Sequence, residues 1–192
     1  MHPLKTLAVP LLAAALAACA AEAPSETLET DTPMTTQTSD AATVERTKRT
    51  ILDFLEGLER KDMAQVNGVW AEDGVQEMPY TPPGVDFPSR VEGRDALIAQ
   101  YAGWPDNAGS ANFTDELVFH ETGDPNVVIA EYRGVTEVVP TGRTYDQRYI
   151  GVFRVNSDGK IELFREYFDP NVFAEAFGMS ADSQTFTDNG KD

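Results

Sequence analysis

The sequence predicts an α+β fold in which helices precede a mainly antiparallel sheet. Apolar residues recur at helical spacing early in the chain, at Val44, Ile51, Phe54 and Leu58. The second half instead holds four segments of strand composition, separated by the turn sequences GDPN, PTG and NSDG. Helices that come before an antiparallel meander pack on one face of its sheet.

Three helices are expected before the meander, at 44–60, directly after Asp62, and at 94–101. Asp62 can cap the second helix, and Met63, Val66 and Trp70 form its apolar side. A short strand at 75–78 follows, and then a loop whose prolines cannot join a ladder. This loop has the sequence MPYTPPGVDFP.

The four strands are expected at 111–121, 127–139, 143–156 and 160–168. A last helix follows over 170–177. Asp169 can cap its first amides, Pro170 suits the first helical position and Gly178 suits the turn beyond its end.

The expected strands carry apolar residues on both faces. Within the third strand, Ile150 and Val152 share one face, while Tyr149, Phe153 and Val155 share the other. The helices can cover one face of the sheet. A second copy of the chain is the simplest cover for the other face, and side chains of the amino-terminal segment are the alternative.

The amino terminus has the pattern of a secretion signal over residues 1–18. A lysine precedes an apolar run that is too short to span a bilayer, and the run ends at Cys19. The sequence Leu-Ala-Ala-Cys at 16–19 resembles the lipobox of bacterial lipoproteins, in which the cysteine is lipidated; an ordinary cleavage site with an incidental cysteine is the alternative. Ala20 carries no retention acid, so the known sorting rules imply an outer-membrane anchor that faces the periplasm.

Composition divides the remaining chain into three parts. Residues 19–43 are expected to be a disordered acidic tether rich in Thr and Ser, residues 44–180 a single domain, and residues 181–192 a disordered tail. Loss of Lys5 with the signal leaves 14 basic residues against 32 acidic ones, a net charge of −18. Because such a charge repels phosphates, a nucleic-acid partner is excluded.

The order of several motifs resembles the SnoaL-like branch of the nuclear transport factor 2-like superfamily, which includes polyketide cyclases and phenazine-biosynthesis proteins. The motifs are WAEDGVQEMPY, VEGRDALIAQY, TGRTYDQRYIGVFRV, DGKIELFREYFDP and NVFAEAFG, and the resemblance covers residues 44–178. It implies a cone-shaped fold, with a strongly curved sheet around a long helix, an apolar pocket at the open end, and a homodimer formed through the outer sheet face.

Glu166 is the first candidate for chemistry. It shares a strand face with Glu162, Phe164 and Phe168. If this face lines the pocket, the apolar wall would raise the pKa of Glu166 and suit it to proton transfer. The resemblance to phenazine-type relatives supports an acid at this position. The alternative is that Glu166 faces solvent or pairs with an arginine.

Other residues are weaker candidates for the site. Asp86 lies in the proline-rich loop and is either a second catalytic carboxylate or a turn residue. Tyr80, Glu131 and Tyr149 are expected in the pocket wall, with ion pairing on the strand as the alternative for Glu131. Phe164 and Trp70 complete the expected wall.

No cofactor or metal is expected. Without Cys19 the chain has no thiol, and His120 is the one histidine left after signal removal, which is far short of a metal site. Dinucleotide, phosphate-loop and nucleophile-elbow motifs are missing. Two functions remain open, with a small apolar or carbonyl-containing molecule as partner. One is metal-free isomerase or cyclase chemistry, and the other is binding of a small molecule or of another protein without catalysis.

Overall fold

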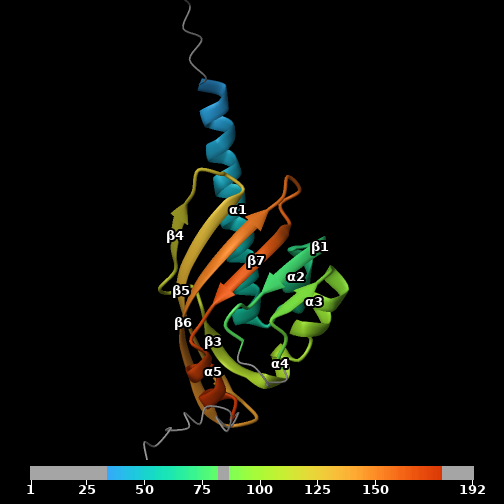
Figure 1. Cartoon of the computed structure of the whole chain (residues 1–192), viewed down its shortest axis with the longest axis vertical. Coiled ribbons are helices and arrows are strands. Elements are labelled where there is room, and N and C mark those ends of the chain that lie inside the picture. The colour runs from blue at the N-terminus through green and yellow to red at the C-terminus, as the bar shows by residue number, and fades with distance from the viewer. Residues whose placement is uncertain (1–33, 82–86, 179–192) are drawn as a thin grey trace, which may run out of the picture. The chain divides into compact units, whose positions relative to one another are not determined.

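The computed structural model of the chain describes residues 34–81 and 87–178 (Figure 1). Five helices and seven strands are described: α1 (Met34–Arg60), α2 (Met63–Gly68), β1 (Trp70–Glu77), β2 (Arg90–Glu92), α3 (Arg94–Tyr101), α4 (Trp104–Asn107), β3 (Ala108–Asn112), β4 (Val118–Glu121), β5 (Val127–Val138), β6 (Arg143–Val155), β7 (Ile161–Tyr167) and α5 (Pro170–Ala176). Helices come before most of the strands, so the α+β prediction is confirmed. None of the described helices is long and apolar enough to cross a membrane.

Helix α1 begins ten residues earlier than the apolar spacing predicts, at Met34 and not at Val44. The carboxyl-terminal part of the expected tether is therefore helical. The sequence of this extension has no apolar stripe. Near its end the Thr43 hydroxyl donates to the carbonyl of Ser39 at 3.0 Å, within the same helix. The signal, Cys19, the rest of the tether and the tail lie outside the described residues.

The segment after Asp62 differs from the expectation in where its helix ends. Asp62 caps α2 as predicted, with its carboxylate accepting from the Gln65 amide at 3.1 Å. The helix stops at Gly68, however, and Trp70 starts strand β1 rather than completing a helical face. This strand runs parallel to β7, with Trp70 opposite Ile161. Pairing with a strand about ninety residues away has overridden the local helical pattern.

The seven strands form one curved, unclosed sheet in the order β2-β1-β7-β6-β5-β3, with β4 also paired to β5. The expected strand at 111–121 is in fact two strands, β3 and β4, which pair with opposite ends of β5. The chain leaves the sheet between them, where the Glu59 carboxylate of α1 accepts from the Phe113 and Thr114 amides at 2.6 and 2.8 Å. These bonds satisfy two backbone donors that the sheet does not use.

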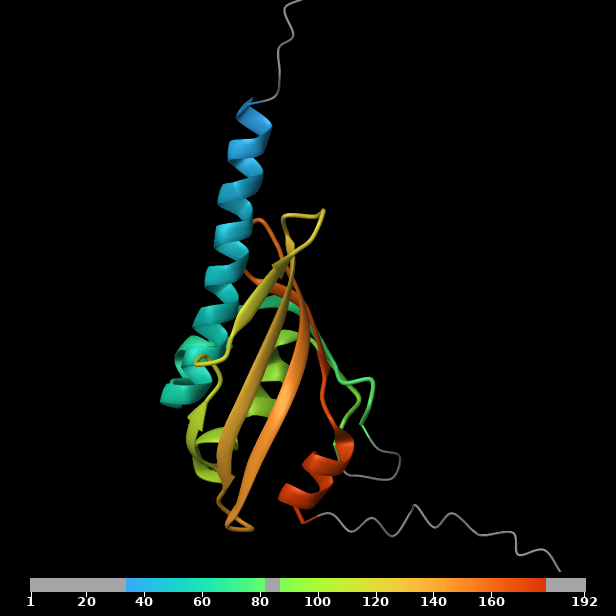
Figure 2. The same ribbon diagram turned by 90° about the vertical axis from the view of Figure 1, so that its left-hand side faces the viewer.

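The last helix follows the prediction closely. Asp169 caps α5 by accepting from the Asn171 amide at 2.8 Å, and Gly178 has a positive φ of 69°. The helix lies beside the turn between β5 and β6. There the Thr141 hydroxyl donates to the Ala176 carbonyl at 2.7 Å and links the turn to the helix. Figure 2 shows α1 alongside the curved strands and α5 near the end where β5 turns into β6.

The core lies between α1 and the inner face of the sheet. Phe54 of α1 is 1% exposed and makes edge-to-face contacts with four aromatic rings, those of Trp70, Tyr101, Phe153 and Phe164. Two glycines let rings lie flat against the strands. A Cβ at Gly134 would come within 2.6 Å of the Phe113 ring, and one at Gly151 would come within 2.6 Å of the Phe153 ring.

The outer face of the sheet mixes apolar and charged side chains. Ile150 and Val118 are 48% and 52% exposed, although both lie on strands. Beside them Arg133 forms ion pairs with Asp146 at 2.6 Å and with Glu116 at 2.9 Å. This face therefore exposes large apolar side chains that a fully solvated sheet face would not be expected to carry.

Candidate functional site

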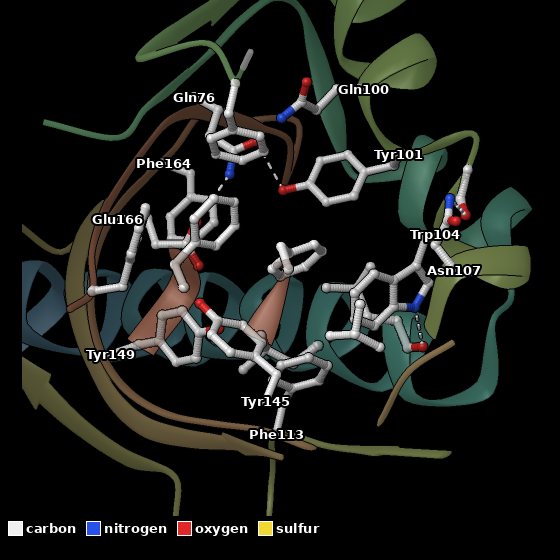
Figure 3. Close-up of a pocket in the computed structure, with 18 of the residues that line it drawn as sticks. Gln76, Gln100, Tyr101, Trp104, Asn107, Phe113, Tyr145, Tyr149, Phe164 and Glu166 are labelled. Atoms are coloured by element: carbon white, nitrogen blue, oxygen red, sulfur yellow. Dashed lines mark hydrogen bonds between the residues drawn. The ribbon is translucent and has the colours of Figure 1, made fainter. Parts of the chain in front are cut away.

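A cavity of about 410 Å³ lies between α1 and the inner face of the sheet, and α3, α4 and α5 contribute to its wall. Its lining is mainly aromatic. The aromatic lining residues are Phe54, Phe87, Tyr101, Trp104, Phe113, Tyr132, Tyr145, Tyr149, Phe164, Phe168, Phe173 and Phe177. Figure 3 shows several of these rings pointing toward one another across the cavity. A concave, mostly apolar site with a few polar groups is typical of a small-molecule site.

Strand β7 delivers one carboxylate to this cavity. Strand alternation places Phe164, Glu166 and Phe168 on the inner face, and all three line the cavity. Arg165 points the other way and pairs with Glu77 of β1, with Nε and Oε2 2.6 Å apart. Glu166 is therefore not the partner of a neighbouring arginine, and its accessible surface borders the cavity.

Two neutral groups donate to the two oxygens of Glu166. The Tyr132 hydroxyl on β5 donates to Oε1 at 3.3 Å, and Nε2 of Gln76 on β1 donates to Oε2 at 3.2 Å. Burial raises the pKa of Glu166 to about 7, although these two hydrogen bonds act in the opposite direction. The carboxyl group can therefore take up or release a proton near neutral pH.

The tyrosines around Glu166 are neutral hydrogen-bond donors. Burial raises the pKa of Tyr145 to about 12, and it raises the pKa of Tyr101, Tyr132 and Tyr149 well above the ordinary value of tyrosine. The negative charge of Glu166 raises each of these pKa values further. The Tyr132 and Tyr149 rings stack with their centroids 4.9 Å apart, which fixes both hydroxyls on adjacent strands.

Among the residues that the structure describes, one carboxyl group carries the charge of the cavity wall. Among the described residues that line it, none is basic and Glu166 is the one carboxylic acid. The described part of the wall offers no cation to an anionic ligand, whereas its aromatic rings and neutral hydroxyls suit an uncharged ligand. Chemically, the group can remove a proton from a bound molecule and return it.

Of the other expected wall residues, two line the cavity and three do not. Tyr149 and Phe164 contribute to its wall. Trp70 is fully buried behind Phe54 and Tyr101, because it belongs to β1 and not to a helix. Its expected place in the wall is wrong.

Tyr80 and Glu131 were expected in the same wall and lie elsewhere. Tyr80 is 58% exposed and packs edge-to-face on Tyr167, which points to the outer face. Glu131 also points outward and lies 3.3 Å from His120 on the neighbouring strand β4. Both expectations are wrong. Tyr80 follows the end of β1 and lies in a turn, and for Glu131 the residue order along its strand does not tell which face is concave.

Asp86 lies outside the described residues, so its catalytic role stays a prediction. Within the described parts of the chain, no group of three or more His, Cys, Asp or Glu side chains is arranged to hold a metal ion.

Several site residues were not expected from the sequence. Gln76, Tyr101, Tyr132 and Tyr145 all line the cavity, and the first three form a hydrogen-bonded group with Glu166. One signal was available for Gln76. In the expected strand at 75–78 it shares a face with Met78, so a polar amide lies beside an apolar side chain. The tyrosines carried no such signal, since half-buried tyrosines are common in cores.

Comparison with known proteins identifies the class of this chain. The model of the SnoaL-like domain matches residues 51–164, more than half of the chain, so the chain belongs to the SnoaL-like domain family. The uncharacterised protein YesE of Bacillus subtilis is 36% identical over 136 residues, which are 71% of this chain and 90% of YesE. An uncharacterised PhzA/B-like protein of Pseudomonas aeruginosa is 34% identical and covers 68% of this chain and 89% of its own length.

Solved structures show the same fold. A Bacillus subtilis protein described as a candidate isomerase is 34% identical, covers 72% of this chain and 96% of its own, and superposes with a TM-score of 0.65. A Pseudomonas aeruginosa phenazine biosynthesis-related protein superposes with a TM-score of 0.62 at 19% identity, covering 79% of this chain and 91% of its own. A Mycobacterium tuberculosis protein crystallised with estradiol-17beta-hemisuccinate gives 0.57 at 18% identity, with coverages of 66% and 96%. The expected family and fold are therefore confirmed.

Proposed function

We propose that the chain binds a small, uncharged, largely apolar carbonyl compound in the aromatic cavity and that Glu166 transfers a proton on it without a metal. The reaction begins when the carboxylate of Glu166 removes a proton from the carbon next to the carbonyl group. The C–H electron pair then moves to form an enolate. When the ketone carries a neighbouring C=C bond, the enolate is conjugated with it, and return of the proton from Glu166 to the far carbon of that bond gives an isomer. When the molecule carries a second carbonyl, attack of the enolate carbon on it closes a ring in an aldol-type cyclisation, and Glu166 returns its proton to the alkoxide that forms.

The observation that carries this proposal is the setting of Glu166. Its carboxyl group borders a cavity whose described lining is aromatic and free of basic side chains, and both of its oxygens accept hydrogen bonds from neutral donors. A neutral tyrosine such as Tyr145 can donate to the developing enolate oxygen, because burial keeps its hydroxyl protonated. The Bacillus subtilis structure described as a candidate isomerase, which is 34% identical, supports the reaction class.

Hydrogen exchange in deuterated water tests this function directly. Neutral aryl ketones such as 1-tetralone are incubated with the protein, and deuterium on the carbon next to the carbonyl is followed by NMR. We expect exchange above the buffer rate for ketones that bind. Binding without exchange across the panel would favour the second candidate, a non-catalytic small-molecule carrier, which the same aromatic cavity supports. A native mass spectrum of the purified chain shows whether either kind of ligand is carried along.

The proposed location is the bacterial envelope, with the protein held by lipid on Cys19. Since Cys19 is the single cysteine of the chain, Cys19→Ser removes the acylation site, and the product should move from the membrane fraction to the soluble fraction. Fractionation followed by immunoblotting measures this change. A Cys19→Ser chain that stays in the membrane fraction would refute the lipid anchor.

The proposed assembly is a homodimer formed through the outer sheet face. Ile150 and Val118 are about half exposed there, and a partner would bury them together with a total area of roughly 1,000 Å² or more. We expect the unlipidated Cys19→Ser chain to have a dimeric mass at micromolar concentration in sedimentation or light scattering. Ile150→Glu should shift it toward the monomer, and a monomeric mass for the parent would contradict the assignment.

A further inference from the structure

Tyr101 is connected to Glu166 through the side chain of Gln76 and does not bond Glu166 itself. Tyr101 ends helix α3, and its hydroxyl donates to Oε1 of Gln76 at 2.8 Å. Nε2 of the same amide donates to Glu166 at 3.2 Å. Figure 3 shows the side chains of Tyr101 and Gln76 joined by a hydrogen bond at the edge of the cavity. One amide therefore links a tyrosine on a helix to the carboxylate on β7.

The two ends of the Gln76 amide are not equivalent, since one donates and the other accepts. If the amide were turned over, its oxygen would face the Glu166 carboxylate, and two acceptors would meet without a proton between them. The Tyr101 hydroxyl would at the same time lose its acceptor. Gln76 is 2% exposed, so water cannot readily take over either bond.

We propose that Gln76 is a positioning residue for Glu166, and that Tyr101 sets the orientation in which the amide presents its N–H group to the carboxylate. The inference rests on the proposed function, because it assigns the control of the proton-transferring group. Tyr101 acts through Gln76: its hydroxyl holds the amide oxygen, and the amide nitrogen then stabilises the ionised form of Glu166 and fixes one of its oxygens.

The polar groups that face Glu166 are few and neutral, so the effect of Tyr101 on its protonation can be measured separately. They are Gln76 on β1, Tyr101 on α3, Tyr132 on β5, and Tyr145 and Tyr149 on β6. All four tyrosines are neutral at pH 7 because burial raises their pKa values. No charged side chain among the described lining residues competes with them for Glu166. A change in the Tyr101 hydroxyl should therefore reach Glu166 mainly through Gln76.

A titration of the Glu166 carboxyl carbon tests the proposal without any ligand. The unlipidated Cys19→Ser chain is labelled with ¹³C at the glutamate side-chain carboxyls, and the Glu166 signal is identified by its loss in Glu166→Gln. In Tyr101→Phe the amide is free to turn its oxygen toward Glu166, which favours the protonated carboxyl. The titration midpoint should rise by about one pH unit, a tenfold gain in proton affinity.

Three further variants complete the experiment. Gln76→Met removes the amide at similar volume and should raise the midpoint at least as far as Tyr101→Phe. Tyr132→Phe removes a direct donor and calibrates the size of such a change. Tyr145→Phe removes a hydroxyl from the same cavity that bonds neither Gln76 nor Glu166, and it should leave the midpoint within roughly 0.2 units.

Two outcomes would overturn the inference: a Tyr101→Phe midpoint equal to that of the parent, or an equal shift in Tyr145→Phe. The amide spectrum of each variant verifies its fold. Failure of the proposed function appears elsewhere, as the lack of ketone exchange by a parent whose Glu166 still titrates as described.

Discussion

Glu166→Gln is expected to abolish proton exchange on bound ketones while the protein still folds and still takes up ligand. Glutamine keeps the volume of the side chain and one acceptor oxygen, but it cannot receive a proton. Loss of a positioned general base costs about 10²- to 10⁴-fold in rate. The measurement is the deuterium exchange rate of parent and variant at saturating ketone, with affinity determined separately.

The pH dependence of the parent should carry the signature of this group. The carboxylate is the form that removes a proton, and the pKa of Glu166 is raised by burial to about 7. The exchange rate should therefore increase as the pH rises through about 7 and level off above it. An exposed acid with an ordinary pKa would instead give a rate that is flat over this range.

The contribution of Glu166 to the free energy of unfolding should fall as the pH rises, whereas the exchange rate should increase. Because the folded pKa of about 7 lies above the ordinary 4.5, the stabilising contribution of protonated Glu166 is fully present below pH 4.5 and is lost as the pH rises through 7. Ionisation inside the cavity then costs up to roughly 3 kcal/mol. Urea unfolding at several pH values should show Glu166→Gln gaining stability relative to the parent above pH 7.

A suitable control is Glu175→Gln. Glu175 lies on α5 and is exposed, and it does not line the cavity, so this variant should keep the exchange rate and its pH dependence. A Glu166→Gln protein that exchanges ketones like the parent would disprove the role of Glu166 as a base. Such a result would leave the cavity as a binding site.

Phe54→Ala is expected to cause the largest loss of stability among single substitutions of the core. The Phe54 ring is 1% exposed and contacts four other aromatic rings, so its removal leaves a space that these rings cannot fill without leaving their own positions. Substitutions of this kind cost about 3–5 kcal/mol. Urea or thermal unfolding of the parent and the variant measures the difference.

Two controls separate cavity formation from other effects of this change. Phe54→Leu keeps most of the apolar volume and should cost clearly less than the alanine variant. Val139→Ala removes methyl groups from a side chain that is 50% exposed and should stay within about 0.5 kcal/mol of the parent. If Phe54→Ala costs no more than Val139→Ala, the ring does not hold the core as described.

Local patterns in the sequence determined much of this protein. The apolar spacing of 44–60, the Asp62 and Asp169 caps, and the three strand segments from residue 127 onward follow from interactions within a few residues. The alternation that puts Glu166 on the same face as Phe164 is equally local. These features could be predicted because backbone geometry alone repeats at 3.6 or 2 residues.

Tertiary structure decided which of these local faces forms the cavity. Trp70 changed from helix to strand because β1 pairs with β7, and the same pairing brings Gln76 beside Glu166 from ninety positions away. The inward position of Tyr132 and the outward position of Glu131 depend on which face of the finished sheet is concave. The inward position of Tyr101 depends on how α3 packs against that sheet. Strand order and curvature are set by the packing free energy of residues far apart in the chain, and short sequence patterns do not contain that information.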